Sequence, residues 1–576
     1  TNPKKLDFNK YHLDRNTGYI DLTINALTPV YIRGTRNKYK DKSETTPEFF
    51  SPVGQPAIPG SSIKGMIRNL IEILSYSKME FIDKDIKYHF RSFADYSIDL
   101  RQEYKNMLVG GDETKGYYAK ALGGYIKKVG INEYIIHPAK TTPTHFRVEE
   151  DLAIMAGVID KRMKDEGYQP QVVEVYFKNE QEKVHKHSKL LKYAKVIDIM
   201  KAKGKIPDGY KKGWLVCSGF IGQKSPHPKH MHWVIGEIDA TRSFNILPEA
   251  IENYKKDEWR KSDNILDKIK KINDYYPCFF TTDGRFVNSF GNTGFYRVPY
   301  RKSVGDLLPP VHNDKNIMDI TTAIFGNEKD FCGRVFFTNA KAVTKENIFM
   351  PTIYPKILSG PKPTSFQLYL EQSNPDYTDP KKIKNLKNYN SGGAKIRGYK
   401  LYWHNSKAEY EQKNMDEIKK HQTQYTKITP IKIGTVFKGR IYFENLSDIE
   451  LGALLFALDL PDGLAHKIGM GKPLGLGSIR ITPTLYLSNR ERRYTDFFAE
   501  LESIEKKENI SDYKNFFEKY ISNQIKSNFL SLWNVDRIRK LKILLDFKNQ
   551  KPPQSIEYMI LGEFKARSVL PSPEKV

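Results

Sequence analysis

A glycine-rich stretch, His466–Ile481, has the residue types of an anion-binding loop. It reads HKIGMGKPLGLGSIRI and contains four glycines and two lysines: Gly469, Gly471, Gly475, Gly477, Lys467 and Lys472. Glycine lets a backbone turn through positive φ and approach a ligand closely. Successive exposed N–H groups in such a turn bind anions, and lysines beside them add positive charge. We expect this loop to contact phosphates, and an ordinary flexible loop is the alternative.

The spacing of this stretch excludes two common nucleotide-binding loops. It does not match GxxxxGK[ST], so it is not a P-loop. No GxGxxG register fits, and the stretch leads into an apolar strand candidate, whereas the dinucleotide fingerprint opens a helix. The loop therefore favours the phosphate backbone of a polyanion over a free nucleotide.

A helix is predicted within Ile58–Ser75, which reads IPGSSIKGMIRNLIEILS. The Pro-Gly turn indicates where it begins, and Ser61 or Ser62 is expected to be its N-cap. The apolar residues follow the spacing of one helix face: Ile63, Met66, Ile67, Leu70, Ile71 and Leu74. This face is predicted to lie in the core.

Two cations of this helix form the second candidate phosphate site. Lys64 and Arg68 are four residues apart, so they share another face near the helix start. Free N–H groups and the positive end of the helix dipole lie there as well, and together they favour an anion. A solvated basic face is the alternative.

Histidines and cysteines are candidates for catalysis and metal binding. His466, beside the glycines, is a candidate general base because an unperturbed imidazole titrates near working pH; a phosphate contact and a packed histidine are the alternatives. No CxxC or HxxxH pair occurs among the remaining ligand types, so we expect no metal site. Those residues are Cys217, His227, His230, His232, Cys278 and Cys332.

Charge and composition agree with a nucleic-acid partner. The 576 residues include 93 Lys and Arg against 68 Asp and Glu, a formal net charge of +25. Aromatic residues make up 12% of the chain and offer stacking surface for unpaired bases, although most are expected in the core. Three scattered cysteines, a polar N-terminus and the lack of a long apolar run predict a cytoplasmic protein without a membrane span.

The elements around the two candidate sites predict an α+β fold. Tyr19–Leu27 alternates as a half-buried strand, and Thr435–Phe443 reads as another strand. A capping box at Ser447–Glu450 opens a second helix, and Ser478–Ile481 forms the closing strand. With the first helix, this order fits a ferredoxin-like (RRM-like) βαββαβ core with one strand unplaced.

The two halves of this core lie far apart, so the middle of the chain must be inserted between them. We predict core halves at 1–80 and 316–485, a mainly β insertion at 81–315 and a helical C-terminal extension at 486–576. Strands are expected at Gly124–Ile136, Gln171–Phe177, Trp214–Ile221 and His232–Ile238, the last two as a hairpin. Lys178–Lys205 is expected to be an exposed helix or loop, and Ser488–Lys506 and Asp512–Phe547 to be helical.

Several motifs together resemble one known family. IPGSSIKG followed late in the chain by G-x-G-x-x-x-G-x-G resembles the RAMP superfamily of CRISPR proteins, and within it the backbone subunits of type III effector complexes. Ala323–Ala340 resembles the family's LFG…GRVFFSDA segment. Asn288–Tyr300 and Lys395–His404 resemble a longer RAMP variant. The resemblance covers about half of the chain.

The resemblance also places a catalytic aspartate in doubt. Backbone subunits of this family often cut target RNA with the aspartate of a GGIDSPV segment, and here Pro47–Val53 reads PEFFSPV, with Phe50 in that position. A phenylalanine neither holds a metal nor takes a proton. Asp41, Glu44 and Glu48 are the nearby acids that would have to substitute, and Mg²⁺ would be required only in that case.

The expected function is therefore a structural RNA-binding subunit. It would hold CRISPR guide RNA by its phosphates and present the bases to target RNA, within a complex of other CRISPR effector subunits. The expected RNA contacts are Arg33, Lys38, Lys40, Ser61, Ser62, Lys64, Arg68, Lys467, Gly469, Gly471, Lys472, Gly475 and Gly477. The alternatives are an endoribonuclease and a scaffold that docks a separate nuclease.

Overall fold

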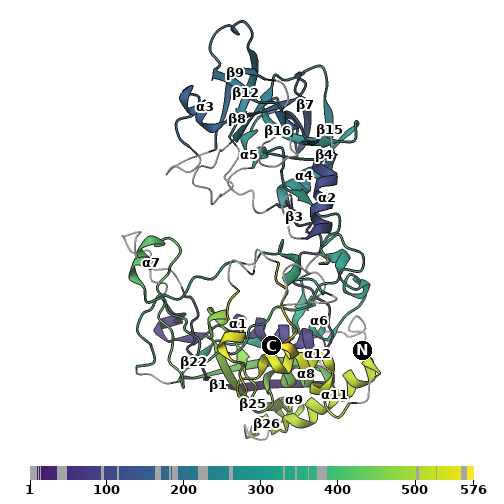
Figure 1. The fold of residues 1–576 in the computed structure, drawn as a ribbon. Helices are drawn as coiled ribbons and strands as arrows, with labels where there is room; N and C mark the ends of the chain where they lie inside the picture. Colours follow the sequence, from purple (N-terminus) through teal and green to yellow (C-terminus); the bar gives the residue numbers. More distant parts are fainter. Residues whose placement is uncertain are drawn as a thin grey trace.

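The protein has a mixed α+β fold (Figure 1). The computed structural model describes residues 10, 12, 14–34, 48–92, 97–112, 116–162, 170–180, 183–184, 192–217, 231–257, 264–328, 331–343, 347–360, 362–372, 386–500, 505–526, 529–559, 563 and 567–576. No helix within these segments combines the length and the apolarity that a membrane crossing requires.

The main sheet joins strands from both ends of the chain. Its central strand is β1 (Asn16–Ala26), which pairs antiparallel with β23 (Val436–Leu446) on one side and β25 (Ser478–Ser488) on the other. The shorter strands of the sheet are β2 (Ala57–Ile58), β21 (Val335–Phe337), β22 (Ala340–Ala342), β24 (His466–Lys467) and β26 (Glu505–Glu508). The strands predicted for β1, β23 and β25 are confirmed.

Strands β21 and β22 provide the strand of the βαββαβ order that the sequence pattern left unplaced. Both pair with β23, so the order across the sheet is β22, β23, β1 and β25. With β21 and β22 counted as one interrupted strand, the main elements of this sheet run along the chain as β1, α1, β21–β22, β23, α8 and β25.

Alternation along β1 decides which face of the sheet is buried. Ile20, Leu22, Ile24 and Ala26 are all at most 2% exposed, and the residues between them face the other side. The buried face is covered by α1 (Gly60–Leu74) and α8 (Asp448–Leu458). The predicted apolar face of α1 is confirmed.

The start of α1 differs from the prediction. Its N-cap is Pro59, and neither Ser61 nor Ser62 caps it because both lie inside the first turn. The N–H of Gly60 instead donates to Asn339 Oδ1 at 2.9 Å. Asn339, which is distant in sequence, thus satisfies a free N–H group at the helix start that an N-cap side chain would otherwise bind.

Helix α8 is buried on all sides, and its capping box is formed as predicted. The C-terminal helix α11 (Ile510–Ile525) packs across it so closely that a Cβ on Gly452 would overlap the carbonyl oxygen of Tyr513. Phe456 of α8 also stacks on Trp533, with ring centroids 5.3 Å apart. The C-terminal extension therefore packs on the core.

This extension is only partly helical. Helices α11 and α12 (Asp536–Leu545) confirm the second predicted helical stretch. The first stretch contains the short helix α9 (Arg490–Thr495), but β26 then adds a strand to the main sheet beside β25. The prediction of a helix there is wrong, because pairing with an open strand edge overrides the charged composition.

The middle of the chain forms a second group of elements, drawn away from the main sheet in Figure 1. Five strands close a barrel: β6 (Leu122–Gly130), β7 (Glu133–Pro138), β15 (Phe244–Ile246), β16 (Tyr275–Thr282) and β17 (Phe286–Gly291). Five more form an open sheet: β8 (His145–Glu149), β9 (Val172–Asn179), β12 (Val196–Lys201), β13 (Lys211–Val216) and β14 (Met231–Gly236).

Two strand predictions in this region need correction. The single strand expected at Gly124–Ile136 is the hairpin β6–β7, which turns at Asn132 with φ 61°. The exposed helix or loop expected at Lys178–Lys205 contains strand β12, because Val196 and Ile199 are buried in the sheet core between charged neighbours. The pairing of β13 with β14 is confirmed, and the predicted loop between them falls outside the described residues.

The remaining elements are short. The helices are α2 (Ile98–Leu108), α3 (Glu150–Met155), α4 (Pro248–Lys256), α5 (Ile265–Lys268), α6 (Ile320–Phe325) and α7 (Met415–Lys420). The strands are β3 (His89–Phe90), β4 (Val109–Asp112), β5 (Gly116–Ala119), β10 (Lys183–Val184), β11 (Lys192–Tyr193), β18 (Val298–Pro299), β19 (Gly326–Asn327) and β20 (Phe331–Cys332).

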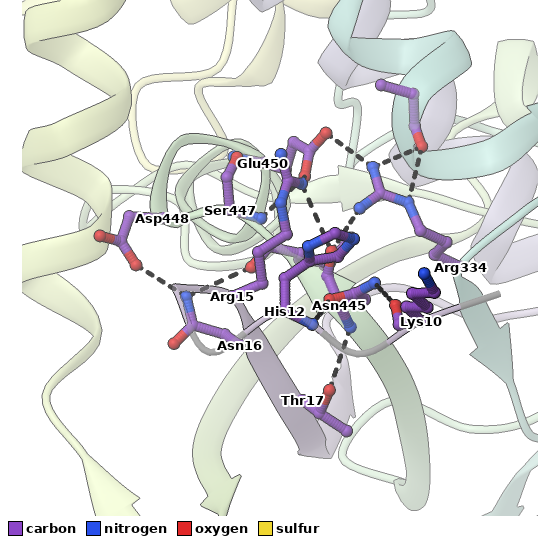
Figure 2. A network of polar contacts seen from close by, with 12 residues as sticks. Lys10, His12, Arg15, Asn16, Thr17, Arg334, Asn445, Ser447, Asp448 and Glu450 are labelled. Carbon is purple, nitrogen blue, oxygen red and sulfur yellow. Dashed lines mark hydrogen bonds and ion pairs between the residues drawn. The ribbon is translucent and has the colours of Figure 1, made fainter. Parts of the chain in front are cut away.

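A buried polar network closes one end of the main sheet (Figure 2). Glu450 of α8 receives Arg15 at 2.9 Å and Arg334 at 2.6 Å, one on each carboxylate oxygen. Arg334 also donates to the carbonyl oxygens of Ala323, at the end of α6, and of Asn445. Burial raises the pKa of Glu450, but the two arginines and the cap hydrogen bond outweigh it and lower the pKa. The network joins the segment before β1 to α8 and to the end of α6.

Candidate nucleic-acid interface

The glycine-rich loop runs from α8 to β25 at the other end of the main sheet. Gly469, Gly471, Gly475 and Gly477 have φ angles of 80°, 69°, 89° and 81°, all in the left-handed region that favours glycine. A single turn of 3-10 helix, η8 (Lys472–Leu474), lies between the second and third glycine. The composition of this stretch therefore predicted its backbone conformation correctly.

The loop is held in place by the segment that follows β1. The N–H of Gly477 donates to Pro29 O at 2.8 Å, and the N–H of Met470 donates to Tyr31 O at 2.9 Å. Across the base of the loop, the N–H of Ile468 donates to Gly477 O at 2.8 Å. The loop is consequently a fixed part of the sheet end, which argues against an ordinary flexible loop.

The last two glycines are required by packing within the protein. A Cβ on Gly477 would overlap the carbonyl oxygen of Ile468, and a Cβ on Gly475 would overlap that of Asn405. The protein itself fills the space beside both residues. Any ligand must approach the other part of the loop, around Gly471 and Lys472.

Backbone donors are present in that part. The hydrogen bonds between described residues use the N–H groups of Ile468, Met470 and Leu474–Gly477, and none uses those of Gly469, Gly471 or Lys472. Such N–H groups beside a left-handed glycine suit an anion.

The two lysines of the loop lie in different environments. Lys467 Nζ points back under the loop and donates to Lys472 O at 3.0 Å and to Leu476 O at 3.2 Å. Burial, and then the charge of Lys472, lower the pKa of Lys467 to about 7. Lys467 thus ties the loop together, and its Nζ is engaged by the protein rather than presented to a ligand.

Lys472 lines a pocket that the sequence did not reveal. The pocket has a volume of about 200 Å³ and is bounded by Gly469–Pro473 and by Leu358, Ser359, Lys400, Tyr402 and Tyr558. Lys400 Nζ lies 5.5 Å from the ring centroid of Tyr402, and Tyr558 is 47% exposed. Two lysines, two tyrosine rings and backbone donors together suit a phosphate and an unstacked base.

One signal in the sequence pointed towards this pocket. Lys400 and Tyr402 belong to Lys395–His404, which was singled out by resemblance and without a role. Tyr558 comes from the C-terminal extension, and nothing in its sequence context marks it. Only the fold brings these segments to the glycine-rich loop.

Arg33 and Glu48 lie at the same end of the sheet. Arg33 is exposed in the segment after β1 and forms an isolated bridge with Phe49, and the N–H of Gly34 donates to Glu48 O at 2.8 Å. Phe50 packs partly against the core and donates its N–H to Ile32 O. The other candidates of this region, Lys38, Lys40, Asp41 and Glu44, lie outside the described residues.

The cations of α1 pack against aromatic rings away from the glycine-rich loop. Lys64 Nζ lies 5.9 Å from the ring centroid of Phe325, at the end of α6. The guanidinium of Arg68 lies between Phe81 and Phe325, at 4.3 and 5.7 Å from their centroids, and burial lowers its pKa. For Arg68 the alternative of a plain solvated face is therefore wrong. Ser61 is exposed and Ser62 half-buried on the first turn.

His466 occupies the core. It is 2% exposed, and its Nε2 lies 2.8 Å from the carbonyl oxygen of Ala457 in α8. Burial lowers its pKa to about 4. This position is that of a packed histidine, and it does not suit a general base for RNA cleavage.

The cysteines and histidines considered as metal ligands lie in different parts of the described structure. Cys217 and Cys278 are buried, Cys332 is exposed, and His232 lies 3.4 Å from Glu150. Within the described segments, no three His, Cys, Asp or Glu side chains are grouped as a metal site requires. His227 and His230 fall outside those segments.

Comparison with known proteins identifies one family. The sequence model of the RAMP superfamily matches residues 23–149 and 248–480, which together make up more than half of the chain. The two matched regions contain the end of β1, all of α1 and α8, and the four glycines of the glycine-rich loop. No curated protein matches the sequence significantly.

Proposed function

Because the chain belongs to the RAMP superfamily, which carries a CRISPR-associated RNA-binding function, we propose that it is a guide-RNA-binding backbone subunit of a type III-like effector complex. It holds the guide RNA by its phosphates and presents the bases for pairing with target RNA. Sequence specificity then comes from base pairing, while the protein contacts the RNA backbone. Its other partners are further effector subunits.

The fold supports this proposal through the arrangement of the main sheet. The βαββαβ order, with β22, β23, β1 and β25 side by side and α1 and α8 on one face, is the order of a ferredoxin-like core. We assign this unit, interrupted between α1 and α6, as the RAMP core. The barrel and the open sheet in the middle of the chain are the insertion.

One observation carries the RNA-binding site: the rigid glycine-rich loop borders a pocket that contains Lys400 and Lys472. Within the described segments neither lysine forms an ion pair, so both charges are available to a phosphate. Tyr402 and Tyr558 add ring faces on which a base can stack. Arg33 extends the positive charge along the same end of the sheet.

Two observations weigh against cleavage by this subunit. The position of the family aspartate is occupied by Phe50, whose ring packs partly into the core. The candidate base His466 is buried. We therefore propose binding and presentation of RNA rather than slicing. Incubation of the purified protein with precursor and target RNAs, with and without Mg²⁺, should give stable complexes and no products.

The pocket is tested by the double variant Lys400→Glu/Lys472→Glu. It should lose most of the guide RNA that copurifies with the wild-type protein, because two cations at the phosphate position become two anions. The matched control is Lys203→Glu/Lys205→Glu, which makes the same charge change at exposed lysines in the middle of the chain. Equal RNA loading of the two double variants would refute the pocket as the binding site.

A further inference from the structure

The face of the main sheet opposite α1 and α8, called here the open face, carries a row of aromatic side chains. Phe336 of β21 pairs with Tyr442 of β23, Tyr442 pairs with Tyr19 of β1, and Tyr19 pairs with Tyr486 of β25. These four residues, the aromatic row, thus lie side by side on four adjacent strands. Alternation places each of them opposite the buried core residues of its strand.

The aromatic row is accessible. Phe336 is 52% exposed and Tyr442 is 45% exposed, while Tyr19 and Tyr486 are half-buried. Tyr19 stacks on Tyr486 with ring centroids 4.9 Å apart and lies 6.2 Å from Tyr442. The three tyrosine rings are therefore in contact with one another, and Phe336 lies beside Tyr442 on the next strand. Such a group differs from singly scattered exposed residues, which require no explanation.

Cations accompany the rings on the same face. The guanidinium of Arg440 lies 3.8 Å from the ring centroid of Tyr19 and 5.7 Å from that of Tyr442. Arg440 also forms an ion pair with Asp21, in which Arg440 Nε lies 2.6 Å from Asp21 Oδ1. Arg440 thereby stiffens the platform and keeps a planar cation at its surface.

Two further lysines create a local excess of positive charge. Lys341 of β22 and Lys438 of β23 are directly paired across the strands, and both are exposed. Among the described residues neither has an ion-pair partner. Like charges directly opposite each other on neighbouring strands are destabilising, so this pair is relieved by an anion. It lies about 13 Å along β23 from the aromatic row.

From these observations we propose that the open face binds a single-stranded RNA segment, with bases stacked on the two exposed rings of the aromatic row, Phe336 and Tyr442, and a phosphate between Lys341 and Lys438. Stacking platforms beside cations are the general means of binding unpaired nucleic acid, because every base has a π face. This site is separate from the pocket of the glycine-rich loop, and it lies on strands rather than on a loop. The proposal for the open face can therefore be tested without assuming that the pocket binds RNA.

The first test uses Phe336→Ala/Tyr442→Ala and a short fluorescein-labelled oligouridine RNA. Anisotropy titration should show binding weakened by about fivefold or more, because stacking contributes that much per base. Tyr275→Ala, an equally exposed tyrosine on the barrel strand β16, is the control and should bind like the wild type. Unchanged affinity in the folded double variant would overturn the proposal and point to a protein partner on this face.

Ring chemistry gives a second test that does not depend on truncation. Tyr442→Phe keeps the stacking surface and should retain affinity, whereas Tyr442→Leu keeps apolar bulk without a ring and should lose it. Equal affinities of these two variants would contradict stacking. Photo-crosslinking of the wild-type protein to 4-thiouridine RNA should label peptides that contain Phe336 or Tyr442, and labelling confined to other segments would overturn the proposal.

Two sets of variants distinguish RNA binding at the open face from RNA binding at the pocket of the glycine-rich loop. Lys341→Gln/Lys438→Gln should flatten the salt dependence of oligouridine binding by about 0.7 in the log–log slope, the contribution of one phosphate on a single strand. Lys400→Glu/Lys472→Glu should reduce guide RNA loading and leave crosslinking at the open face in place. Loss of both together in either variant would refute two separate sites.

Discussion

At the scale of single residues, two lysines of one loop differ because of what their side chains contact. Lys467 donates to two carbonyl oxygens inside the loop, whereas Lys472 faces the pocket. We predict that Lys467→Met lowers the free energy of unfolding by roughly 2 kcal/mol, because two part-buried carbonyl groups lose their donor. Lys472→Met should leave stability unchanged and weaken RNA binding. Urea unfolding and anisotropy on both variants separate the two roles, and the reverse pattern would contradict them.

Glu450 provides a pH-dependent prediction at the same scale. Its folded pKa lies below the usual value of 4.5, so the stability it contributes is present above that value and is lost as the pH falls through the folded pKa. Glu450→Gln should cost about 3 kcal/mol at neutral pH, because two buried arginines lose their anion. The difference from the wild type should shrink in acid. Urea unfolding at several pH values measures it, and a difference independent of pH would argue against the ion pairs.

At the scale of elements, the glycine-rich loop is shaped by backbone contacts as much as by glycine's freedom. Gly477 and Gly434 have similar φ angles of 81° and 82°, but a Cβ meets backbone only at Gly477. Gly434→Ala should therefore cost about 1–2 kcal/mol, the cost of the left-handed conformation alone. Gly477→Ala should cost ~2 kcal/mol more, because the added atom overlaps Ile468 O. Equal unfolding free energies of the two variants would show that the loop shifts freely.

At the scale of the whole molecule, the net charge of +25 favours RNA binding, and the number of phosphates contacted sets how that binding responds to salt. Each neutralised phosphate of a single strand contributes about −0.7 to the slope of log affinity against log salt. With the glycine-loop pocket, Arg33 and the open face all engaged, guide RNA binding should show a slope steeper than about −2, equivalent to three or more phosphates. Filter binding across a range of salt concentrations measures this slope. A slope flatter than about −0.7 would limit the contacts to one phosphate and contradict an extended interface.

The features that could be predicted before the fold was known are those that local sequence pattern controls. The alternation in β1, the apolar face of α1, the capping box before α8 and the positive φ angles of the glycine-rich loop all followed from residues close together in the chain. Periodicity and glycine content act over a few residues, so they can be interpreted without a fold. The family motifs are local in the same sense.

Which distant residues share an environment depends on tertiary packing. Asn339 caps α1, Lys467 turns inward, and Tyr558 reaches the pocket from the C-terminal extension. The aromatic row likewise joins β1, near the start of the described chain, to three strands from its second half. Burial and strand register set these contacts, because a charge or ring acquires its role from what the folded chain places beside it. The same lysine composition that predicts RNA binding therefore cannot indicate which lysine holds the loop and which one lines the pocket.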